Sequence, residues 1–184
     1  METSPPDDNS LAARAARGDL ASFQVIVERY QTSIFRMTFQ FVKDYHLAQD
    51  LAQEVFVRAF RNLAKFDPER GNFSTWLYTI ARNASCSALR KVKPFHRSHS
   101  LPEAEDEVTP SSHATRHDEF LRLDAALAEL EEPFKSAFIL AEIEELPLAQ
   151  VAEIEAVPVG TIKSRVSRAK ERLRRILSET NELS

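Results

Sequence analysis

The sequence contains little glycine, one cysteine and no long apolar run. Three glycines among 184 residues are too few for a β-sandwich or β-barrel, whose many tight turns need residues that tolerate positive φ. The single cysteine, Cys86, has no partner for an internal disulfide and cannot form a cysteine zinc cluster. The most apolar stretch, residues 34–42, contains Arg36 and is much shorter than the roughly 20 residues that cross a bilayer. These absences favour a mostly helical chain without a membrane span.

Signals for export and for catalysis are also absent. The first ten residues, METSPPDDNS, contain acids and prolines, whereas a secretory signal has a basic start and an apolar centre. The sequence lacks the nucleophile-elbow, P-loop, dinucleotide-binding and zinc-protease motifs. The acids of AEIEELP and EAEDE lie in polar surroundings and indicate no general acid–base pair. We therefore expect a cytosolic protein that is not an enzyme and has no cofactor.

Apolar residues recur at helical spacing through the first ninety residues. The repeats are Phe23, Ile26, Val27, Tyr30, Ile34 and Phe41 in one run, Leu47, Leu51, Val55, Phe56, Phe60 and Leu63 in the next, and Trp76, Leu77, Ile80, Ala84 and Leu89 in a third. Asp44 is a suitable N-cap for the second helix, and Ser74 for a third that runs to about Lys93. Between these helices, FDPERGN (66–72) predicts a loop. A short leading helix is expected within residues 7–19, ended by Gly18.

The periodicity disappears over residues 94–116, which contain three prolines, the acidic run EAEDE and several Ser and Thr. This composition predicts a flexible, solvated linker. Fully extended at about 3.3 Å per residue, it would span roughly 60–70 Å, so the flanking segments could act at separated places. Its histidines, or those at its edge, match no zinc-site spacing, and we expect no metal there; they are His96, His99, His113 and His117.

Helical periodicity returns beyond the linker and ends in a basic segment. In LPLAQVAEIEAVPVGTIKSRVSRAKERL, a short helix, a break at EAVP and a longer helix follow one another, which is the helix-turn-helix layout. Pro147 and Pro158 fit the two helix starts. We therefore predict an all-α fold of two small helical domains, 1–93 and 117–184, joined by the linker 94–116, with the helix-turn-helix in the C-terminal domain.

Seven of the thirteen residues in 163–175 are Lys or Arg, although the whole chain has a net charge of −4. At about 100° per residue, one side of this helix is apolar and the other basic. The inward residues are Ile162, Val166, Ala169, Leu173, Ile176 and Leu177, and the outward ones Lys163, Ser164, Ser167, Arg168, Arg174 and Arg175. Arg165 and Arg172 flank the apolar stripe, where their stems can pack. Cations and hydroxyls suit phosphates and guanine edges. An ordinary solvated helix is the alternative, but the preceding turn and short helix favour DNA contact.

Two stretches resemble a known family. VPVGTIKSRVSRAKERLR resembles the C-terminal DNA-reading domain of bacterial sigma factors of the extracytoplasmic-function (ECF) type, within the sigma-70 family. Residues 44–83, DYHLAQDLAQEVFVRAFRNLAKFDPERGNFSTWLYTIARN, resemble their N-terminal promoter-melting domain. The resemblance implies a protein that binds the β′ coiled coil and the β subunit of core RNA polymerase and directs initiation at specific promoters. It also implies a membrane-bound or soluble anti-sigma factor that holds the protein inactive until a stress signal arrives.

The resemblance also implies roles for individual residues. Asp50, Gln53 and Glu54, which share one helical face, match the family's polymerase contacts. Phe66, Arg70, Asn72 and Asn83 match positions that capture a flipped base of the −10 element, for which an amide that both donates and accepts is well suited. Thr161, Lys163, Ser164, Arg165 and Arg168 match the contacts to the −35 element. Trp76, in contrast, belongs to an apolar stripe and is expected in the core.

Two positions depart from the family pattern. Ala156 stands where the turn often has Gly. If this residue must adopt a positive φ, alanine destabilises the turn by roughly 1 kcal/mol relative to glycine. Pro147 stands where a capping Ser is common. A free-standing helix-turn-helix repressor or activator is the competing reading, but it leaves the first ninety residues without a purpose. It also requires tight DNA binding by the protein alone, which an acidic chain disfavours.

Overall fold

The computed structural model describes residues 6–92 and 122–182, and these ranges contain helices and turns but no β-strand. In chain order the helices are α1 (Asp8–Ala16), α2 (Leu20–Val42), α3 (Tyr45–Asn62), a 3₁₀ turn (Leu63–Lys65) and α4 (Phe73–Val92), then a helix at 122–129, α6 (Glu132–Phe138), a π-helical turn (Ile139–Ile143), α7 (Leu148–Glu155) and α8 (Val159–Glu182). The predicted all-α fold is confirmed. The predicted linker, 94–116, and the four histidines in it or at its edge lie outside the described residues.

Local capping fixes most helix starts in the N-terminal half. The N–H of Leu47 donates to Oδ1 of Asp44 at 2.8 Å, which confirms the predicted N-cap of α3. Asp7 and Asp19 cap α1 and α2 in the same way. After α1, Gly18 adopts φ 97° and ends the helix as expected.

The start of α4 departs from the prediction. This helix begins at Phe73, whose N–H donates to Oδ1 of Asn9 at 2.7 Å, so the cap comes from α1, 64 residues earlier in the chain. The hydroxyl of Ser74, the residue expected to cap α4, instead accepts a hydrogen bond from Nε2 of Gln150 at 3.1 Å. Ser74 therefore links α4 to α7, and the predicted cap is wrong.

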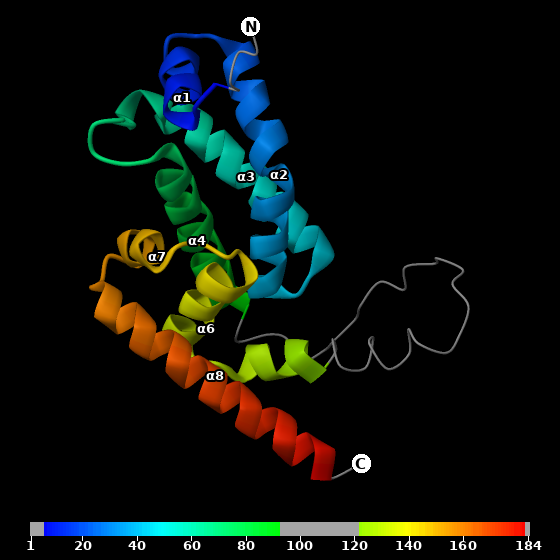
Figure 1. Ribbon diagram of the computed structural model, residues 1–184. Coiled ribbons are helices and arrows are strands. Elements are labelled where there is room, and N and C mark those ends of the chain that lie inside the picture. The colour runs from blue at the N-terminus through cyan, green and yellow to red at the C-terminus, as the bar shows by residue number, and fades with distance from the viewer. Residues whose placement is uncertain (1–5, 93–121, 183–184) are drawn as a thin grey trace, which may run out of the picture.

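The N-terminal half is a packed group of four helices. In Figure 1, α2, α3 and α4 lie against one another, and α1 covers the end farthest from α8. Buried apolar residues from all four helices fill the centre, among them Leu11, Ile34, Phe41, Val55 and Leu77. None of the helices in 6–92 and 122–182 is long and apolar enough to cross a membrane.

The C-terminal helices pack directly on this group. Ile139, Val151 and Ile162 belong to the same buried cluster as Phe41 and Leu77, and α4 contacts α7. A smaller cluster joins the helix at 122–129 to the middle of α8. The two predicted modules therefore share one hydrophobic core in this structure.

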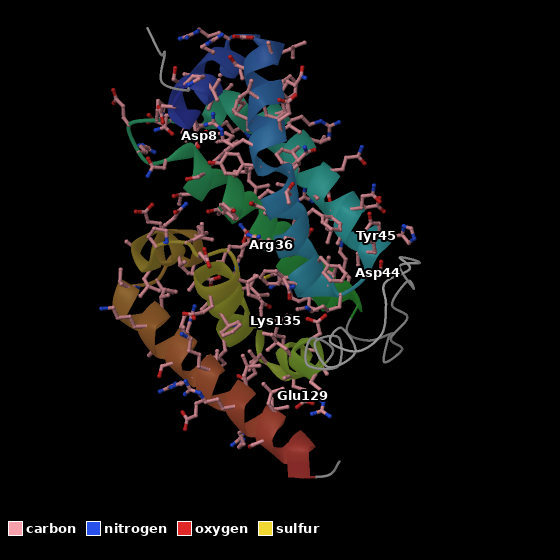
Figure 2. All side chains as sticks on the ribbon, turned by 45° about the vertical axis from the view of Figure 1, so that its right-hand side comes forward. Asp8, Arg36, Asp44, Tyr45, Glu129 and Lys135 are labelled. Carbon is pink, nitrogen blue, oxygen red and sulfur yellow. The ribbon has the colours of Figure 1, made fainter. Side chains whose placement is uncertain are left out.

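Buried charged groups accompany the apolar contact between the two halves. Figure 2 labels one of them, Lys135 on α6, and also labels Arg36 on α2, an exposed side chain that pairs with the buried Glu144. Nζ of Lys135 donates to the carbonyl of Phe41 at 2.9 Å, at the C-terminal end of α2, where a cation is favoured by the helix dipole. Close by, Nζ of Lys43 lies 2.5 Å from Oδ1 of Asp124. The C-terminal half thus covers the end of α2.

Candidate nucleic-acid and partner interfaces

The proposed polymerase contacts lie on an accessible face of α3. Asp50, Gln53 and Glu54 are exposed, whereas Leu51 and Val55 of the same helix are buried. Oε1 of Glu54 accepts hydrogen bonds from its neighbour one turn on, Arg58, at 2.5 and 3.0 Å. A partner can reach all three side chains without any rearrangement of the helix.

An apolar groove runs beside these residues, between α2 and α3. It has a volume of about 760 Å³. Its walls include Leu20, Phe23, Val27, Phe35, Ala52, Gln53, Phe56, Val57 and Phe60. Leu20 is 65% exposed and Phe60 43%, although Phe60 continues the helical repeat that predicts core-facing residues. An exposed cluster of large apolar side chains is characteristic of an interaction site, and sequence periodicity does not distinguish such a cluster from the core.

The residues matched to the −10 element lie on the loop 66–72 and on α4. The ring of Phe66 is half-buried and contacts the rings of Phe73 and Trp76, with centroids 5.4 and 5.6 Å away. Arg70 and Asn72 are exposed on the loop. Trp76 is also half-buried and packs against the core, as expected.

Asn83 lies farther along α4 than the other three. It is exposed, and its Oδ1 accepts a hydrogen bond from Nη1 of Arg82 at 3.3 Å. At about 1.5 Å of rise per residue, it lies roughly 15 Å along the helix from Asn72. The structure thus brings Phe66, Arg70 and Asn72 together on one loop and leaves Asn83 at a separate position.

The basic helix α8 has the predicted two faces. Ile162, Val166, Ala169 and Leu173 are buried. Of the five residues matched to the −35 element, Lys163, Ser164 and Arg168 are exposed, while Thr161 and Arg165 are half-buried. The turn before α8 contains Ala156 at φ 53°, so the residue that replaces the family's usual glycine does adopt the left-handed conformation.

The two arginines that flank the apolar stripe, Arg165 and Arg172, both contact other side chains of the protein. Nη1 of Arg172 donates to Oε1 of Glu131 at 2.9 Å, and its guanidinium lies 5.4 Å from the centroid of Phe134. Nη1 of Arg165 lies 3.3 Å from Oε2 of Glu155. These contacts confirm that the two side chains pack along the helix flank.

Glu155 is the centre of an ion cluster that joins the two halves. Its carboxylate is only 1% exposed and accepts hydrogen bonds from Arg82 on α4, Arg165 on α8 and the hydroxyl of Ser136. Both contacts from Arg82, through Nε and Nη2, measure 3.1 Å. A residue next to the proposed −10 position Asn83 and a proposed −35 residue therefore hold the same carboxylate.

A second buried carboxylate, Glu144, follows the π-helical turn. Its side chain is 0% exposed and receives two hydrogen bonds from Arg36, at 2.8 and 2.9 Å, and these bonds raise the pKa of Arg36. In the sequence, Glu144 and Glu155 lie among other acids with no local sign of burial. Cys86 on α4 is fully buried, and burial raises the pKa of its thiol to about 12, so this cysteine packs in the core.

Comparison with known proteins identifies the family. Residues 26–94 match the sequence model of Sigma-70 region 2, and residues 120–173 match that of Sigma-70 region 4. The ECF sigma factor SigW of Bacillus subtilis is 32% identical over 89% of this chain and 92% of its own length. The chain belongs to the ECF sigma factors of the sigma-70 family.

Other relatives of this ECF sigma factor agree. The RNA polymerase sigma-H factor of Pseudomonas aeruginosa is 33% identical over 92% of this chain and 93% of its own length. Among solved structures, CnrH in complex with the cytosolic domain of CnrY matches with a TM-score of 0.74 and 26% identity, over 94% of this chain and 97% of that one. Bartonella quintana RpoE in complex with the anti-sigma factor NepR matches with a TM-score of 0.68 and 25% identity, over 85% and 96%. The chain directs promoter-specific transcription with RNA polymerase.

Proposed function

We propose that this ECF sigma factor reads the −35 element with the outward face of α8 and the −10 element with the loop 66–72 and α4, while RNA polymerase performs the catalysis. The observation that carries the proposal is the exposed basic face of α8, the second helix of the helix-turn-helix, which lies opposite a buried apolar stripe. Lys163 and Arg168 project from that face and are the main −35 contacts, because cations there can reach both phosphates and guanine edges. We assign smaller contributions to Thr161 and Ser164.

The α3 surface is the docking site for core polymerase in this proposal. Asp50, Gln53 and Glu54 offer hydrogen bonds and negative charge, and Gln53 also lines the apolar groove. A helix of the β′ coiled coil can pack its apolar face in such a groove while its polar side chains pair with the carboxylates of Asp50 and Glu54. The β subunit is the second polymerase contact.

On the −10 side, the loop supplies three kinds of chemistry. Arg70 can pair with a phosphate, and Asn72 can exchange two hydrogen bonds with the edge of an extruded base. Phe66 contributes aromatic surface beside Trp76. Asn83 contacts the promoter separately, farther along α4.

The two DNA-reading surfaces must move apart to act together. In the packed arrangement, Arg82 beside the −10 surface and Arg165 on the −35 surface contact the same carboxylate, that of Glu155. One turn of duplex DNA is roughly 34–36 Å long, and we take the two promoter elements to lie about two turns apart. Simultaneous contact with both promoter elements therefore requires separation of the two halves, and residues 94–116 are long enough to allow it. We propose that the packed arrangement is the form that does not bind promoter DNA.

An anti-sigma factor is the partner we propose for the packed form, because the solved relatives CnrH and RpoE are described in complexes with CnrY and the anti-sigma factor NepR. Such a partner would keep the protein inactive in the cytoplasm until a stress signal arrives. Polymerase and the anti-sigma factor would both bind the exposed groove between α2 and α3, so they would compete for it.

Run-off transcription tests the proposal. Purified protein added to core polymerase should initiate at specific promoters, while the protein alone should bind the same DNA weakly. Tight sequence-specific binding without polymerase, together with no stimulated initiation, would instead support a free-standing regulator. That alternative gives no role to the exposed groove between α2 and α3.

A further inference from the structure

Asn9 of α1 forms hydrogen bonds to the end of the loop 66–72, which lies beside α1 although it is more than 60 residues away in the sequence. Its Oδ1 accepts the N–H of Phe73 at 2.7 Å, and its Nδ2 donates to the carbonyl of Gly71 at 3.4 Å. Among the described residues, Asn9 is the residue outside the loop whose side chain forms hydrogen bonds to the C-terminal end of the loop. A short side chain that donates and accepts at once is a property of Asn.

The two bonds enclose Asn72. The Gly71 carbonyl belongs to the peptide group before Asn72, and the Phe73 N–H belongs to the peptide group after it. Since a peptide group is planar, holding one atom of each restricts the φ and ψ of the residue between them. The direction in which the exposed Asn72 side chain leaves the backbone is thereby set from α1.

Asn9 is itself held firmly. Asp8, the preceding residue, accepts hydrogen bonds from Arg29 and from the hydroxyl of Tyr30, the latter at 2.5 Å, and so ties the start of α1 to α2. Leu11 and Ala12 are buried in the common core. Figure 2 shows Asp8 at this end of the molecule, close to the loop. The amide of Asn9 is therefore a rigid support rather than a mobile surface group.

The rest of the loop is fixed differently. At its beginning, Phe66 packs against Phe73 and Trp76. Its middle is a turn closed by Asp67, whose carboxylate accepts the N–H of Glu69 and whose carbonyl accepts the N–H of Arg70. Among the hydrogen bonds between described residues, only those around Asn72 tie the loop to a different part of the chain, and that part is Asn9.

We infer that Asn9 is a positioning residue for −10 recognition: it fixes the backbone on both sides of Asn72 so that the Asn72 amide meets the promoter base in one orientation. The inference rests on the proposed role of the loop in reading the −10 element. Asn9 touches no DNA in this scheme and acts only through Asn72.

The test compares Asn9→Asp with Asn9→Ala in holoenzyme assembled from core polymerase. Asn9→Asp keeps an oxygen to accept the Phe73 N–H, and its charge is favoured at a helix N-terminus, but it loses the donor to Gly71. Asn9→Ala loses both bonds. Ser10→Ala, an exposed neighbour on α1, is the control. The probe is a single-stranded −10 fragment from a promoter that the wild-type holoenzyme initiates, with versions that change one base at a time.

Asn9→Asp should lower the preference for the correct base over a changed one by roughly three- to tenfold, the effect of one hydrogen bond. Its melting temperature and its affinity for core polymerase should match those of wild type. Asn9→Ala should show the same loss of preference and also a lower melting temperature. In an Asn72→Ala background, Asn9→Asp should cause no further loss, because the two residues act in series.

Unchanged base preference in Asn9→Asp would overturn the inference, and so would an equal weakening for every base, which indicates a general structural defect. An Asn72→Ala variant that reads the −10 strand like wild type would overturn it as well. Failure of the wild-type holoenzyme to initiate at any promoter would instead reject the proposed function, so the two failures are distinguishable.

Discussion

At the scale of single residues, the backbone conformation of Ala156 affects the free energy of unfolding, and the hydrogen bonds of Asp19 affect its pKa. Ala156 has φ 53° and ψ 43° between α7 and α8, and the N–H of Val157 donates to the carbonyl of Ala152 at 3.0 Å across this turn. A residue with a Cβ is strained in that conformation, whereas glycine is not. Asp19 caps α2 and gathers several donors around one carboxylate.

Ala156→Gly should raise the free energy of unfolding by about 0.5–1 kcal/mol, since relief of strain outweighs the added freedom of the unfolded chain. Urea unfolding of the purified protein measures the change. Ala125→Gly, at an exposed position within the helix 122–129, is the control and should lower stability by about 1 kcal/mol. A similar loss at Ala156 would contradict the argument from φ.

The pKa of Asp19 is lowered from its ordinary value of 3.8 to about 2, chiefly by hydrogen bonds from the hydroxyl and N–H of Ser22 and then from Arg14. Since the folded-state pKa is depressed, the contribution of this carboxylate to stability is present above pH 3.8 and is lost as the pH falls through about 2. A carboxyl NMR titration should find this value in the wild type and a higher one in Ser22→Ala. Equal values in the two proteins would refute the assigned cause.

At the scale of helices, α8 and α3 carry surfaces of different chemistry, which we propose bind different partners. The outward face of α8 is basic, whereas α3 presents Asp50 and Glu54 beside an apolar groove. Each surface sits on a helix whose opposite side is buried, so its side chains can be changed with little effect on packing. Substitutions on the two helices should therefore affect separate steps of initiation.

Lys163→Ala and Arg168→Ala should each weaken −35-dependent initiation by about 1–3 kcal/mol, because each removes a cation from the side of α8 that we propose faces DNA. Affinity for core polymerase should stay at the wild-type value. Run-off transcription with intact and altered −35 elements measures the first quantity, and a core-binding titration the second. Arg172→Ala is the control on the same helix, since it contacts Glu131 and Phe134 and should lower stability without changing −35 preference.

The double variant Asp50→Ala with Glu54→Ala should do the reverse. It removes two carboxylates from the proposed docking face, so affinity for core polymerase should fall by roughly tenfold or more, with the larger effect at low salt. Once saturating protein restores complex formation, the −35 preference should equal that of wild type. An unchanged core affinity would exclude α3 as the docking surface.

At the scale of the whole molecule, the two halves form one packed unit through a shared core and through ion pairs that involve buried carboxylates. Glu155, Glu144 and Asp124 each pair with a base from the N-terminal half, namely Arg82, Arg36 and Lys43. A buried carboxylate is tolerated because such partners replace its lost hydration. Removing one partner leaves the other charged and poorly solvated.

Glu155→Ala should lower the free energy of unfolding by about 2–4 kcal/mol, since Arg82 and Arg165 lose their common partner. It should also speed hydrogen exchange along α7 and the facing part of α4 as the halves separate more often. Glu153→Ala, exposed on the same helix, serves as the control and should change stability by less than about 0.5 kcal/mol. Equal effects of the two substitutions would argue against the ion cluster as a link between the halves.

Features that depend on near neighbours in the chain were predictable. The cap at Asp44, the end of α1 at Gly18 and the two faces of α8 all follow from contacts three or four residues apart, which the sequence displays directly. Resemblance to the family added the candidate contacts with DNA and polymerase, whose roles stay predictions. The exposure of the apolar residues around Phe60 could not be predicted, because helical periodicity identifies an apolar side of a helix but not whether other helices cover that side.

The sequence by itself determined the helices, their order, the helix-turn-helix and the family. Only the tertiary structure decided that Asn9 caps α4, that Glu144 and Glu155 are buried, and that the two halves share a core. The physical reason is range: these contacts join residues 64, 108 and 73 positions apart. A polar residue shows no local sign of a partner at that distance, so its role emerges only when the helices that carry both groups have packed.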